Sequence, residues 1–221
     1  MAGQPWVIFA AGDWCEDSII ETWRQHASTI VACDGALKAC LDRDIVPDVF
    51  VGDGDSVCAE TLQSFLDLGG AVHLLGGQDE NDLNKALMFA EERGARTCMV
   101  FGSTGGDRQH EWANLLACAA SPLDVVCLDK NDEYRFFNPL TPYSIDFMLD
   151  QEFSLFALPK AEGISLTGCA YPLNKDVLLM GSKGLHNHAT ETMVNLHFEA
   201  GHLMMIRPRG LDEGAGTNEA S

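Results

Sequence analysis

The first ~130 residues alternate short apolar runs with amphipathic stretches, and this alternation constrains the fold more than any other feature. In the stretch 79–93, Leu83, Ala86, Leu87 and Ala90 follow the i, i+3, i+4, i+7 spacing of one helix face. Strands that are apolar throughout indicate a parallel sheet with helices on both sides. The predicted strands are 7–11, 29–33, 48–51, 71–75, 97–101 and 124–128, and the predicted helices are 17–25, 36–43, 59–68, 79–93 and 107–120.

The pattern changes after residue 130. Residues 131–143 are irregular and contain two prolines, which predicts a linker. Farther on, Val194, Leu196 and Phe198 alternate with polar residues, as in a half-buried antiparallel strand, and Ala200-Gly201 is the predicted turn after it. We therefore expect an α/β domain over 1–130, a linker over 131–143, an all-β domain over 144–209 and a disordered tail over 210–221. The predicted strands of the all-β domain are 153–158, 164–167, 177–180, 193–199 and 202–206.

The charge of the chain excludes several classes of partner. Asp and Glu number 33 against 14 Lys and Arg, a formal net charge of −19. Such a chain repels phosphate backbones and acidic membrane surfaces, so we expect neither nucleic-acid nor membrane binding, and a polyphosphate ligand would need a divalent cation. No membrane-spanning run or secretory signal is recognisable, which predicts a soluble, cytoplasmic protein. The eight cysteines include no C-x-x-C pair, so neither a disulfide framework nor a zinc cluster is expected.

Polar clusters follow four of the predicted strands. Asp34-Gly35 follows the second strand, residues 52–56 the third, residues 78–82 the fourth and residues 102–106 the fifth. Carboxyl ends of parallel strands meet at one edge of an open α/β sheet, and ligands bind there. The sequence therefore predicts a binding site at this edge.

Several carboxylates converge at the predicted edge. Asp53 and Asp55 are two residues apart at a strand end, so both side chains can reach one cation, and Asp79 and Asp82 share a face at a helix start. Converging carboxylates repel one another unless a cation joins them, and ligands that are all oxygen suit Mg²⁺. Lys85, one turn beyond Asp82, can meet a phosphate. The alternative is that these aspartates only form turns and cap helices.

Residues 102–106 are glycine-rich and lie between a strand and a helix. Backbone N–H groups in such a loop, with the helix N-terminus, can bind phosphate, although neither common phosphate-binding glycine motif is present. Arg108 and His110, at the start of the helix, can neutralise phosphate charge. A plain tight turn is the alternative interpretation of this loop.

His186 and His188 are the remaining candidate metal ligands. Side chains two residues apart in a strand lie on one face and can hold a transition metal. No third ligand accompanies them, and no motif indicates a nucleophilic triad.

With these clusters in place, the chain resembles the thiamine pyrophosphokinase family over ~170 residues. The matching segments keep their order and spacing. They are Asp34-Gly35-Ala36, Pro47-Asp48 with Gly52-Asp53-Gly54-Asp55-Ser56, Gln78-Asp79-Glu80-Asn81-Asp82-Leu83-Asn84-Lys85-Ala86, Gly102 to Gly106 with His110 and Ala113-Asn114, and Leu166-Thr167-Gly168-Cys169-Ala170-Tyr171-Pro172-Leu173. Two segments differ from the family pattern. Gly-Gly-Arg-x-Asp-His reads Gly105-Gly106-Asp107-Arg108-Gln109-His110 here, and the expected Ser-Asn pair is His186-Asn187.

The resemblance implies a Rossmann-like N-terminal α/β catalytic domain, a C-terminal antiparallel β-sandwich and a homodimer. Thiamine would lie between the α/β domain of one subunit and the sandwich of the other, with ATP and Mg²⁺ at the acidic edge. The implied reaction moves pyrophosphate from ATP to the hydroxyl of thiamine, giving thiamine diphosphate and AMP.

We assign expected roles on this basis. Asp53, Asp55 and Asp82 are the expected catalytic and Mg²⁺-binding residues, with Asp82 as acceptor of the hydroxyl proton. The expected ATP-binding residues are Asp34, Gly52, Ser56, Asp79, Lys85, Gly102, Ser103, Thr104, Gly105, Gly106, Arg108 and His110, and the expected thiamine-binding residues are Gln78, Tyr171, His186 and Asn187. Two alternatives stay open: a non-catalytic thiamine or nucleotide sensor, and a metal-dependent phosphatase that uses the same acids.

Overall fold

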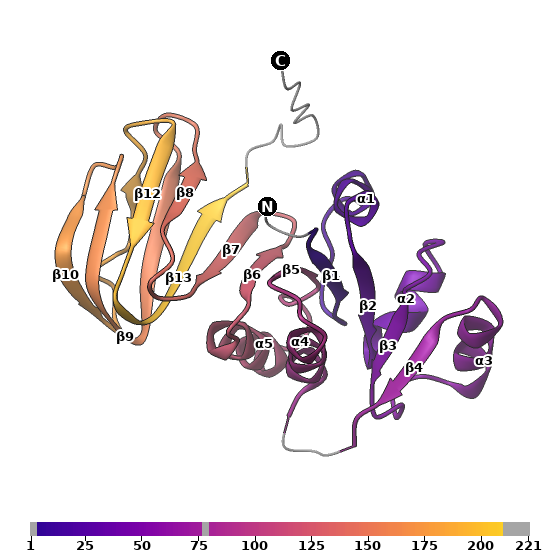
Figure 1. Ribbon diagram of the computed structural model, residues 1–221. Helices are drawn as coiled ribbons and strands as arrows, with labels where there is room; N and C mark the ends of the chain where they lie inside the picture. Colours follow the sequence, from indigo (N-terminus) through magenta and orange to yellow (C-terminus); the bar gives the residue numbers. More distant parts are fainter. Residues whose placement is uncertain (1–3, 77–79, 210–221) are drawn as a thin grey trace.

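The N-terminal half of the chain forms a helix-covered sheet in the computed structural model, which describes residues 4–76 and 80–209 (Figure 1). Its strands are β1 (Trp6–Phe9), β2 (Thr29–Cys33), β3 (Val49–Gly52), β4 (Ala71–Leu74), β5 (Thr97–Phe101) and β6 (Asp124–Leu128). Its helices are α1 (Asp17–Gln25), α2 (Leu37–Leu41), α3 (Ala59–Asp67), α4 (Asp82–Glu92) and α5 (Arg108–Ala120), with a 3-10 turn at Asp34–Ala36. Each predicted strand and helix of this half is confirmed, with ends that differ by a few residues.

The six N-terminal strands are parallel and lie in the order β4-β3-β2-β1-β5-β6. Alternate residues of each strand enter two different cores. Ile8 and Val100 pack with α4 and α5 on one face, whereas Phe9 and Phe50 pack with α1, α2 and α3 on the other. The predicted parallel sheet with both faces covered is therefore confirmed, and the carboxyl ends of its strands meet at one edge.

Antiparallel strands continue this sheet. They are β7 (Asp132–Phe137), β8 (Tyr143–Asp146), β9 (Glu152–Thr167), β10 (Leu173–Leu179), β11 (Asn187–His188), β12 (Met193–His197) and β13 (Ala200–Pro208). From β6 the order runs β7-β13-β9-β12-β8, and both β10 and β11 pair with β9. A separate apolar core, which includes Phe153, Ile164 and Phe198, fills this half. The two halves thus have their own cores and are joined through β7 and β13 (Figure 1).

The structure corrects three expectations about the C-terminal half. Residues 132–137, expected within an irregular linker, form β7, whose buried Glu133 hid the strand pattern by placing a charge inside. The predicted strands 153–158 and 164–167 are one strand, because β10 and β13 pair with Ala161 from both sides. The predicted turn Ala200-Gly201 belongs to β13. β12 and β13 pair with β9 in consecutive antiparallel register, so the two residues between them interrupt a strand and form no hairpin turn. The tail 210–221 lies outside the described residues.

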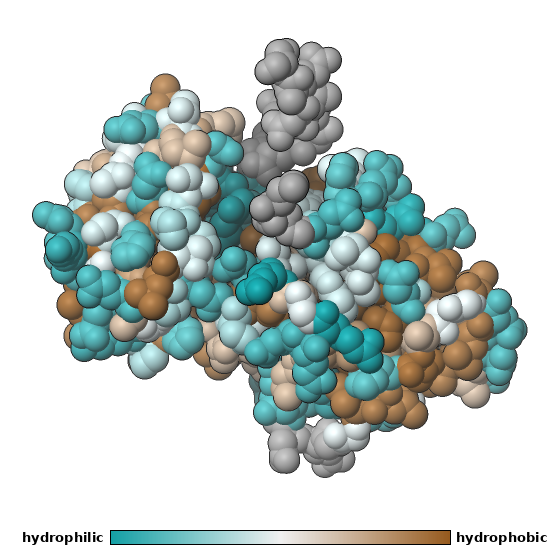
Figure 2. Space-filling model, viewed as in Figure 1, coloured by the Kyte–Doolittle hydropathy of each residue, from teal (hydrophilic) through white to brown (hydrophobic). Residues whose placement is uncertain are grey.

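The surface shows where apolar side chains remain uncovered. Figure 2 shows them gathered near α3 and β4, where Leu66, Leu68 and Leu74 are exposed. No helix within residues 4–76 and 80–209 has both the length and the apolar character needed to cross a membrane.

Candidate active site

A cleft of about 530 Å³ lies at the carboxyl ends of β2 and β3, beside the start of α4. It brings together residues from all four polar clusters that the sequence singled out, which confirms that these clusters converge. Its lining residues are Ala10, Ala11, Gly12, Cys33, Gly35, Asp53, Asp55, Ser56, Glu80, Asn81, Asp82, Leu83, Lys85, Gly105, Gly106, Asp107, His110 and Asn114. Gln78 and Asp79, expected to bind thiamine and ATP, lie outside the described residues.

Three carboxylates at the base of the cleft are close enough to share a metal ion. One oxygen from each of Asp34, Asp53 and Asp55 lies within 4.8 Å of the other two. Asp34 is buried beneath the cleft, where its Oδ2 accepts a hydrogen bond of 2.6 Å from the Gly54 N–H. Its Oδ1 is buried and has no hydrogen-bond partner among the described residues. Burial is the largest cause of the raised pKa of Asp34, and the hydrogen bond from the Gly54 N–H offsets it only in part.

Gly52 makes room for Asp34. A Cβ atom at Gly52 would lie 2.7 Å from the Cβ of Asp34, closer than two such atoms can approach. Gly52 itself is buried at the end of β3 and does not line the cleft. Its position therefore indicates a spacing role beneath the carboxylates.

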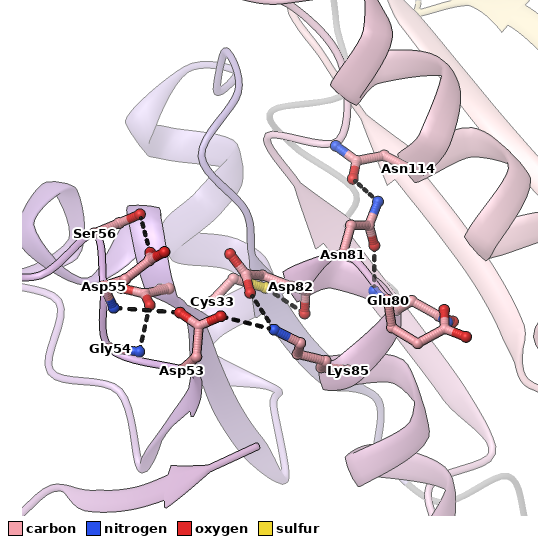
Figure 3. Close-up of polar contacts among 12 residues, drawn as sticks. Cys33, Asp53, Gly54, Asp55, Ser56, Glu80, Asn81, Asp82, Lys85 and Asn114 are labelled. Carbon is pink, nitrogen blue, oxygen red and sulfur yellow. Dashed lines mark hydrogen bonds and ion pairs between the residues drawn. The ribbon is translucent and has the colours of Figure 1, made fainter. Parts of the chain in front are cut away.

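Lys85 is a nearly buried cation between two of the acids (Figure 3). Its Nζ lies 3.2 Å from Asp53 Oδ2 and 3.3 Å from Asp82 Oδ1. The N–H of Asp55 and then Lys85 lower the pKa of Asp53. Burial lowers the pKa of Lys85, but its hydrogen bonds to Asp53 and Asp82 outweigh burial and raise it. Lys85 therefore stays charged and separates Asp82 from Asp53 in the free protein.

Two asparagines without an assigned role hold the walls of the cleft together. Asn81 caps α4 by accepting a hydrogen bond of 2.8 Å from Asn84 N, and its amide donates to Asn114 Oδ1 at 3.0 Å (Figure 3). Asn114 in turn donates to the Ser103 carbonyl at 3.0 Å. This series of hydrogen bonds links α4, α5 and the loop after β5. The N-cap pattern at Asn81 was a signal in the sequence, but its long-range link to Asn114 had none.

The glycine-rich loop 102–106 takes a shape that only glycine permits at two positions. Gly102 and Gly105 have φ of +77° and +83°, and Cβ atoms there would lie 2.3 Å from Ala10 O and 2.6 Å from Asp13 Cγ. The carbonyls of residues 102, 103 and 104 accept hydrogen bonds from Gly12 N, Asn114 Nδ2 and Asp13 N. These carbonyl groups therefore attach the loop to Gly12, Asp13 and Asn114.

The side chains of this loop do not face the cleft. Ser103 and Thr104 are buried, and Thr104 Oγ1 donates to Asp129 Oδ2 at 3.0 Å. Gly105 and Gly106 line the cleft with backbone, and the Gly105 N–H donates to Glu111 Oε2 at 3.0 Å. The expected ATP contacts of Ser103 and Thr104 are therefore restricted to the backbone.

The start of α5 is capped by an acid. Asp107 accepts a hydrogen bond of 3.1 Å from Gln109 N and contacts His110 Nδ1 at 2.7 Å. The hydrogen bond with His110 is the largest cause of the lowered pKa of Asp107. His110 lines the cleft, whereas Arg108 is exposed and does not. Only His110 of these two expected phosphate contacts lies at the cleft.

Two of the three expected thiamine residues of the C-terminal half, Tyr171 and Asn187, line a second cavity of about 250 Å³. Asn187 is buried. Its Oδ1 accepts from Tyr171 N at 3.0 Å and its Nδ2 donates to Tyr171 O at 3.0 Å, so it fastens this segment. Tyr171 itself is 66 % exposed. His186 does not line the cavity, and its φ of +57° marks a sharp turn before β11. Within the described ranges, neither His186 nor His188 belongs to a group of three or more side chains placed to hold one metal ion.

Comparison with known proteins shows what this arrangement is similar to. Residues 20–124, which include the acidic cluster and the glycine-rich loop, match the family model "Thiamin pyrophosphokinase, catalytic domain". The thiamine pyrophosphokinase of Bacillus subtilis is 28% identical over 185 residues, which cover 80% of this chain and 86% of that protein. The chain is therefore similar to thiamine pyrophosphokinases over most of its length, and its residues 20–124 match their catalytic domain.

Solved structures with thiamin pyrophosphokinase titles share the fold of the whole chain. The crystal structure from Bacillus subtilis superposes with a TM-score of 0.77 at 24% identity, covering 94% of this chain and 100% of that one. The structure from Geobacillus thermodenitrificans gives 0.73 at 23% identity, covering 94% and 99%. Both halves of the chain, including the antiparallel strands after β6, therefore follow a known arrangement.

Proposed function

We propose that the protein is a thiamine pyrophosphokinase that transfers the pyrophosphoryl group of ATP to the hydroxyl of thiamine, giving thiamine diphosphate and AMP. One observation carries this proposal. In a chain similar to this family, three clustered carboxylates lie beside the charged Lys85, and among the described residues one buried oxygen of the cluster has no hydrogen-bond partner. Pyrophosphoryl transfer depends mainly on alignment and charge neutralisation, which Lys85 and a cation held by these carboxylates would supply.

The acidic cluster fits Mg²⁺. The donors are all carboxylate oxygens, and the partnerless Oδ1 of Asp34 lacks the cationic or hydrogen-bonding neighbour that a buried carboxylate needs. We assign Asp34, Asp53 and Asp55 to this ion and place Asp82 at its margin, because Lys85 lies between Asp82 and Asp53. When bound, the ion would supply charge neutralisation for the phosphate oxygens of ATP.

The remaining cleft residues surround the space for a triphosphate. Lys85 and His110 would offset its negative charge, and the N–H groups of Gly105 and Gly106 would donate to phosphate oxygens. Arg108 would have to swing inward to join them, since it lies outside the lining. Ser56, whose Oγ donates to Asp55 Oδ1 at 2.9 Å, would keep that carboxylate oriented.

The reaction itself needs one bond to form and one to break. The hydroxyl oxygen of thiamine forms a bond to the β-phosphorus, the bond from that phosphorus to the α–β bridging oxygen breaks, and AMP leaves with the electron pair. A carboxylate at the cleft accepts the hydroxyl proton, and we assign this role to Asp82. Asp82 lines the cleft, and its Oδ1 lies 3.3 Å from Lys85 Nζ.

We also propose that the active form is a homodimer with shared sites. The acidic cleft and the Tyr171 cavity have no lining residue in common and lie in different halves of the chain (Figure 1). A thiamine that touches both therefore favours a second copy. β10 pairs with β9 and leaves Leu179 and Met180 exposed, which gives an apolar surface suited to such an interface.

The finer fold assignments belong to the same proposal. We infer that residues 1–130 form a Rossmann-like catalytic domain and residues 144–209 a β-sandwich, with β7 as a structured connection in place of a free linker. The charge of −19 supports a cytoplasmic protein without nucleic-acid or membrane partners.

The assay follows both products. Protein with thiamine, ATP and Mg²⁺ should form thiamine diphosphate and AMP in equal amounts, measured by chromatography. Binding of thiamine without AMP release would indicate the sensor, and phosphate release without thiamine would indicate the phosphatase. Either result would refute the proposed transfer.

Mixed dimers test the shared site. Asp55→Asn and Tyr171→Ala chains, each impaired alone, should regain activity when refolded together, because one of the two sites then carries neither change. Tyr171 suits this test because it is exposed, so its loss should leave the fold intact. Unchanged activity of the mixture would place each site within one chain.

A further inference from the structure

Asp129 lies in the turn between β6 and β7, away from the cleft, yet its carboxylate contacts the glycine-rich loop. Its Oδ2 accepts a hydrogen bond of 3.0 Å from Thr104 Oγ1. Its Oδ1 accepts from the N–H groups of Asn131 and Asp132, at 2.8 Å each. Thr104 is 5% exposed, so this hydrogen bond is shielded from water. The carboxylate therefore fastens the loop to a rigid turn at the end of the sheet.

The same turn is held by Arg209, the residue after β13. Its guanidinium donates to the Asp129 carbonyl and, at 3.1 Å, to Glu16 Oε2. Its backbone N–H donates to Asn131 O at 2.8 Å. β13 pairs with β9 of the C-terminal half and with β7. Asp129 thus lies between the glycine-rich loop and the end of a strand that begins in the other half of the molecule.

Three carbonyls of the loop accept hydrogen bonds from Gly12 N, Asn114 Nδ2 and Asp13 N, and the Thr104 hydroxyl adds a side-chain attachment next to Gly105. The three glycines of the loop adopt positive φ, and glycine is the residue that loses most conformational freedom when it is ordered. The Gly105 N–H already donates to a carboxylate oxygen of Glu111, which shows that an anionic oxygen can occupy this direction. Preorganised donors bind an anion more tightly than donors that must first be ordered.

We propose that Asp129 is a positioning residue for pyrophosphoryl transfer. Through Thr104 it fixes the loop so that the N–H groups of Gly105 and Gly106 face the triphosphate, and through Arg209 it makes the loop depend on the position of the C-terminal half. This inference rests on the proposed function, because the triphosphate is that of the proposed substrate. The carboxylate of Asp129 itself touches no substrate.

The decisive variants change the Thr104 hydroxyl alone. Thr104→Val keeps the shape and removes the donor to Asp129, whereas Thr104→Ser keeps the donor. Thr22→Val is the matched control, since its hydroxyl donates to Ser18 O on the exposed side of α1, far from the loop in the sequence. We expect Thr104→Val to raise the KM for ATP about tenfold, which corresponds to about 1.4 kcal/mol. The KM for thiamine should stay within about twofold, and Thr104→Ser and Thr22→Val should match the wild type.

Amide hydrogen exchange of residues 102–106 in the ligand-free protein measures the loop directly. We expect faster exchange in Thr104→Val and Asp129→Asn, and the wild-type rate in Thr104→Ser. A Thr104→Val protein with an unchanged KM for ATP and unchanged exchange would overturn the proposal, even if its melting temperature fell. If Thr104→Val does not fold, Asp129→Asn takes its place in both measurements.

Binding of a non-hydrolysable ATP analogue with Mg²⁺ separates this inference from the proposed function. A wild-type protein that binds the analogue but makes no thiamine diphosphate would refute the transfer reaction. A tenfold weaker affinity of Thr104→Val for the analogue would still support the positioning role. Equal affinities of the two proteins would contradict it.

Discussion

The acidic cleft and the segment around Asn187 both bring polar side chains together. They differ in whether the buried polar atoms have hydrogen-bond partners. Asn187 is buried with its amide hydrogen-bonded to both backbone groups of Tyr171 and to Cys169 Sγ. In the cleft, Asp34 is equally buried, yet its Oδ1 has no partner in the described part of the chain. A satisfied buried group stabilises the fold, whereas an unsatisfied carboxylate costs stability that a ligand can restore. The comparison predicts that changes to the acids of the cleft act on activity and that loss of the Asn187 amide acts on folding.

The largest expected effect is that of Asp55→Asn. We expect kcat/KM to fall roughly 10³-fold, about 4 kcal/mol of transition-state stabilisation. The melting temperature of the metal-free protein should stay equal or rise, since one of three neighbouring carboxylates loses its charge. Steady-state kinetics and thermal unfolding measure the two quantities. Asp67→Asn, on the exposed side of α3, is the matched control and should change neither.

Glu133→Gln should act on folding instead. Burial raises the pKa of Glu133, but Arg135 and Arg207 outweigh burial and hold the pKa below its usual value. Loss of its charge beside these arginines should cost about 3 kcal/mol of unfolding free energy at pH 7. A carboxyl with a lowered folded pKa stabilises the protein above its unfolded pKa of about 4.5, and this contribution is lost as pH falls through the folded value.

Urea unfolding of wild type and Glu133→Gln at two pH values checks this sign. The difference between the two proteins should be largest at pH 7 and shrink toward pH 3. Glu162→Gln, in a half-exposed pair with Lys160, is the control and should cost less than about 1 kcal/mol. A difference that grows on acidification would contradict the assigned direction.

Asn187→Ala should have a smaller effect of the same kind. It leaves both backbone groups of Tyr171 without their partner, so we expect about 2 kcal/mol of lost unfolding free energy. The KM for ATP should stay at its wild-type value. An unchanged stability together with a raised KM for thiamine would show that the amide serves a ligand, and the contrast drawn between the two regions would fail.

Glu111→Gln should give the smallest effect. The Glu111 carboxylate accepts the Gly105 N–H that the triphosphate is proposed to use. Removal of its charge should lower the KM for ATP roughly twofold, about 0.4 kcal/mol. Titration of the wild type and the variant with a non-hydrolysable ATP analogue measures this. Weaker binding by the variant would show that Glu111 supports the nucleotide rather than competing with it.

The sequence predicts the acidic edge well because the rule that places it is local. Each polar cluster directly follows an apolar strand, and parallel strands bring those ends together without further information. Which acids form the cluster is harder to predict from the sequence. Asp34 joins Asp53 and Asp55, whereas Lys85 holds Asp82 aside, and both facts depend on side-chain directions across separate strands.

The remaining differences arise where long-range partners decide. Thr104 looks like a phosphate contact within its glycine-rich loop, yet its hydroxyl turns to Asp129, 25 residues away. Residues 132–137 look irregular because Glu133 is buried, and Arg207, one of the two arginines that pair with it, lies 74 residues away. Asn187 looks like a ligand contact, but its amide is hydrogen-bonded to the backbone of Tyr171. A periodicity rule sees neighbours along the chain and so misses each of these pairings.

Stabilisation by Mg²⁺ together with a non-hydrolysable ATP analogue tests the central claim, that Asp34, Asp53 and Asp55 bind a cation. Thermal unfolding is measured with and without these ligands for the wild type, Asp55→Asn and Tyr171→Ala. The account predicts a higher melting temperature on ligand addition for the wild type and Tyr171→Ala, and none for Asp55→Asn. Equal stabilisation of all three proteins, or of none, would contradict it.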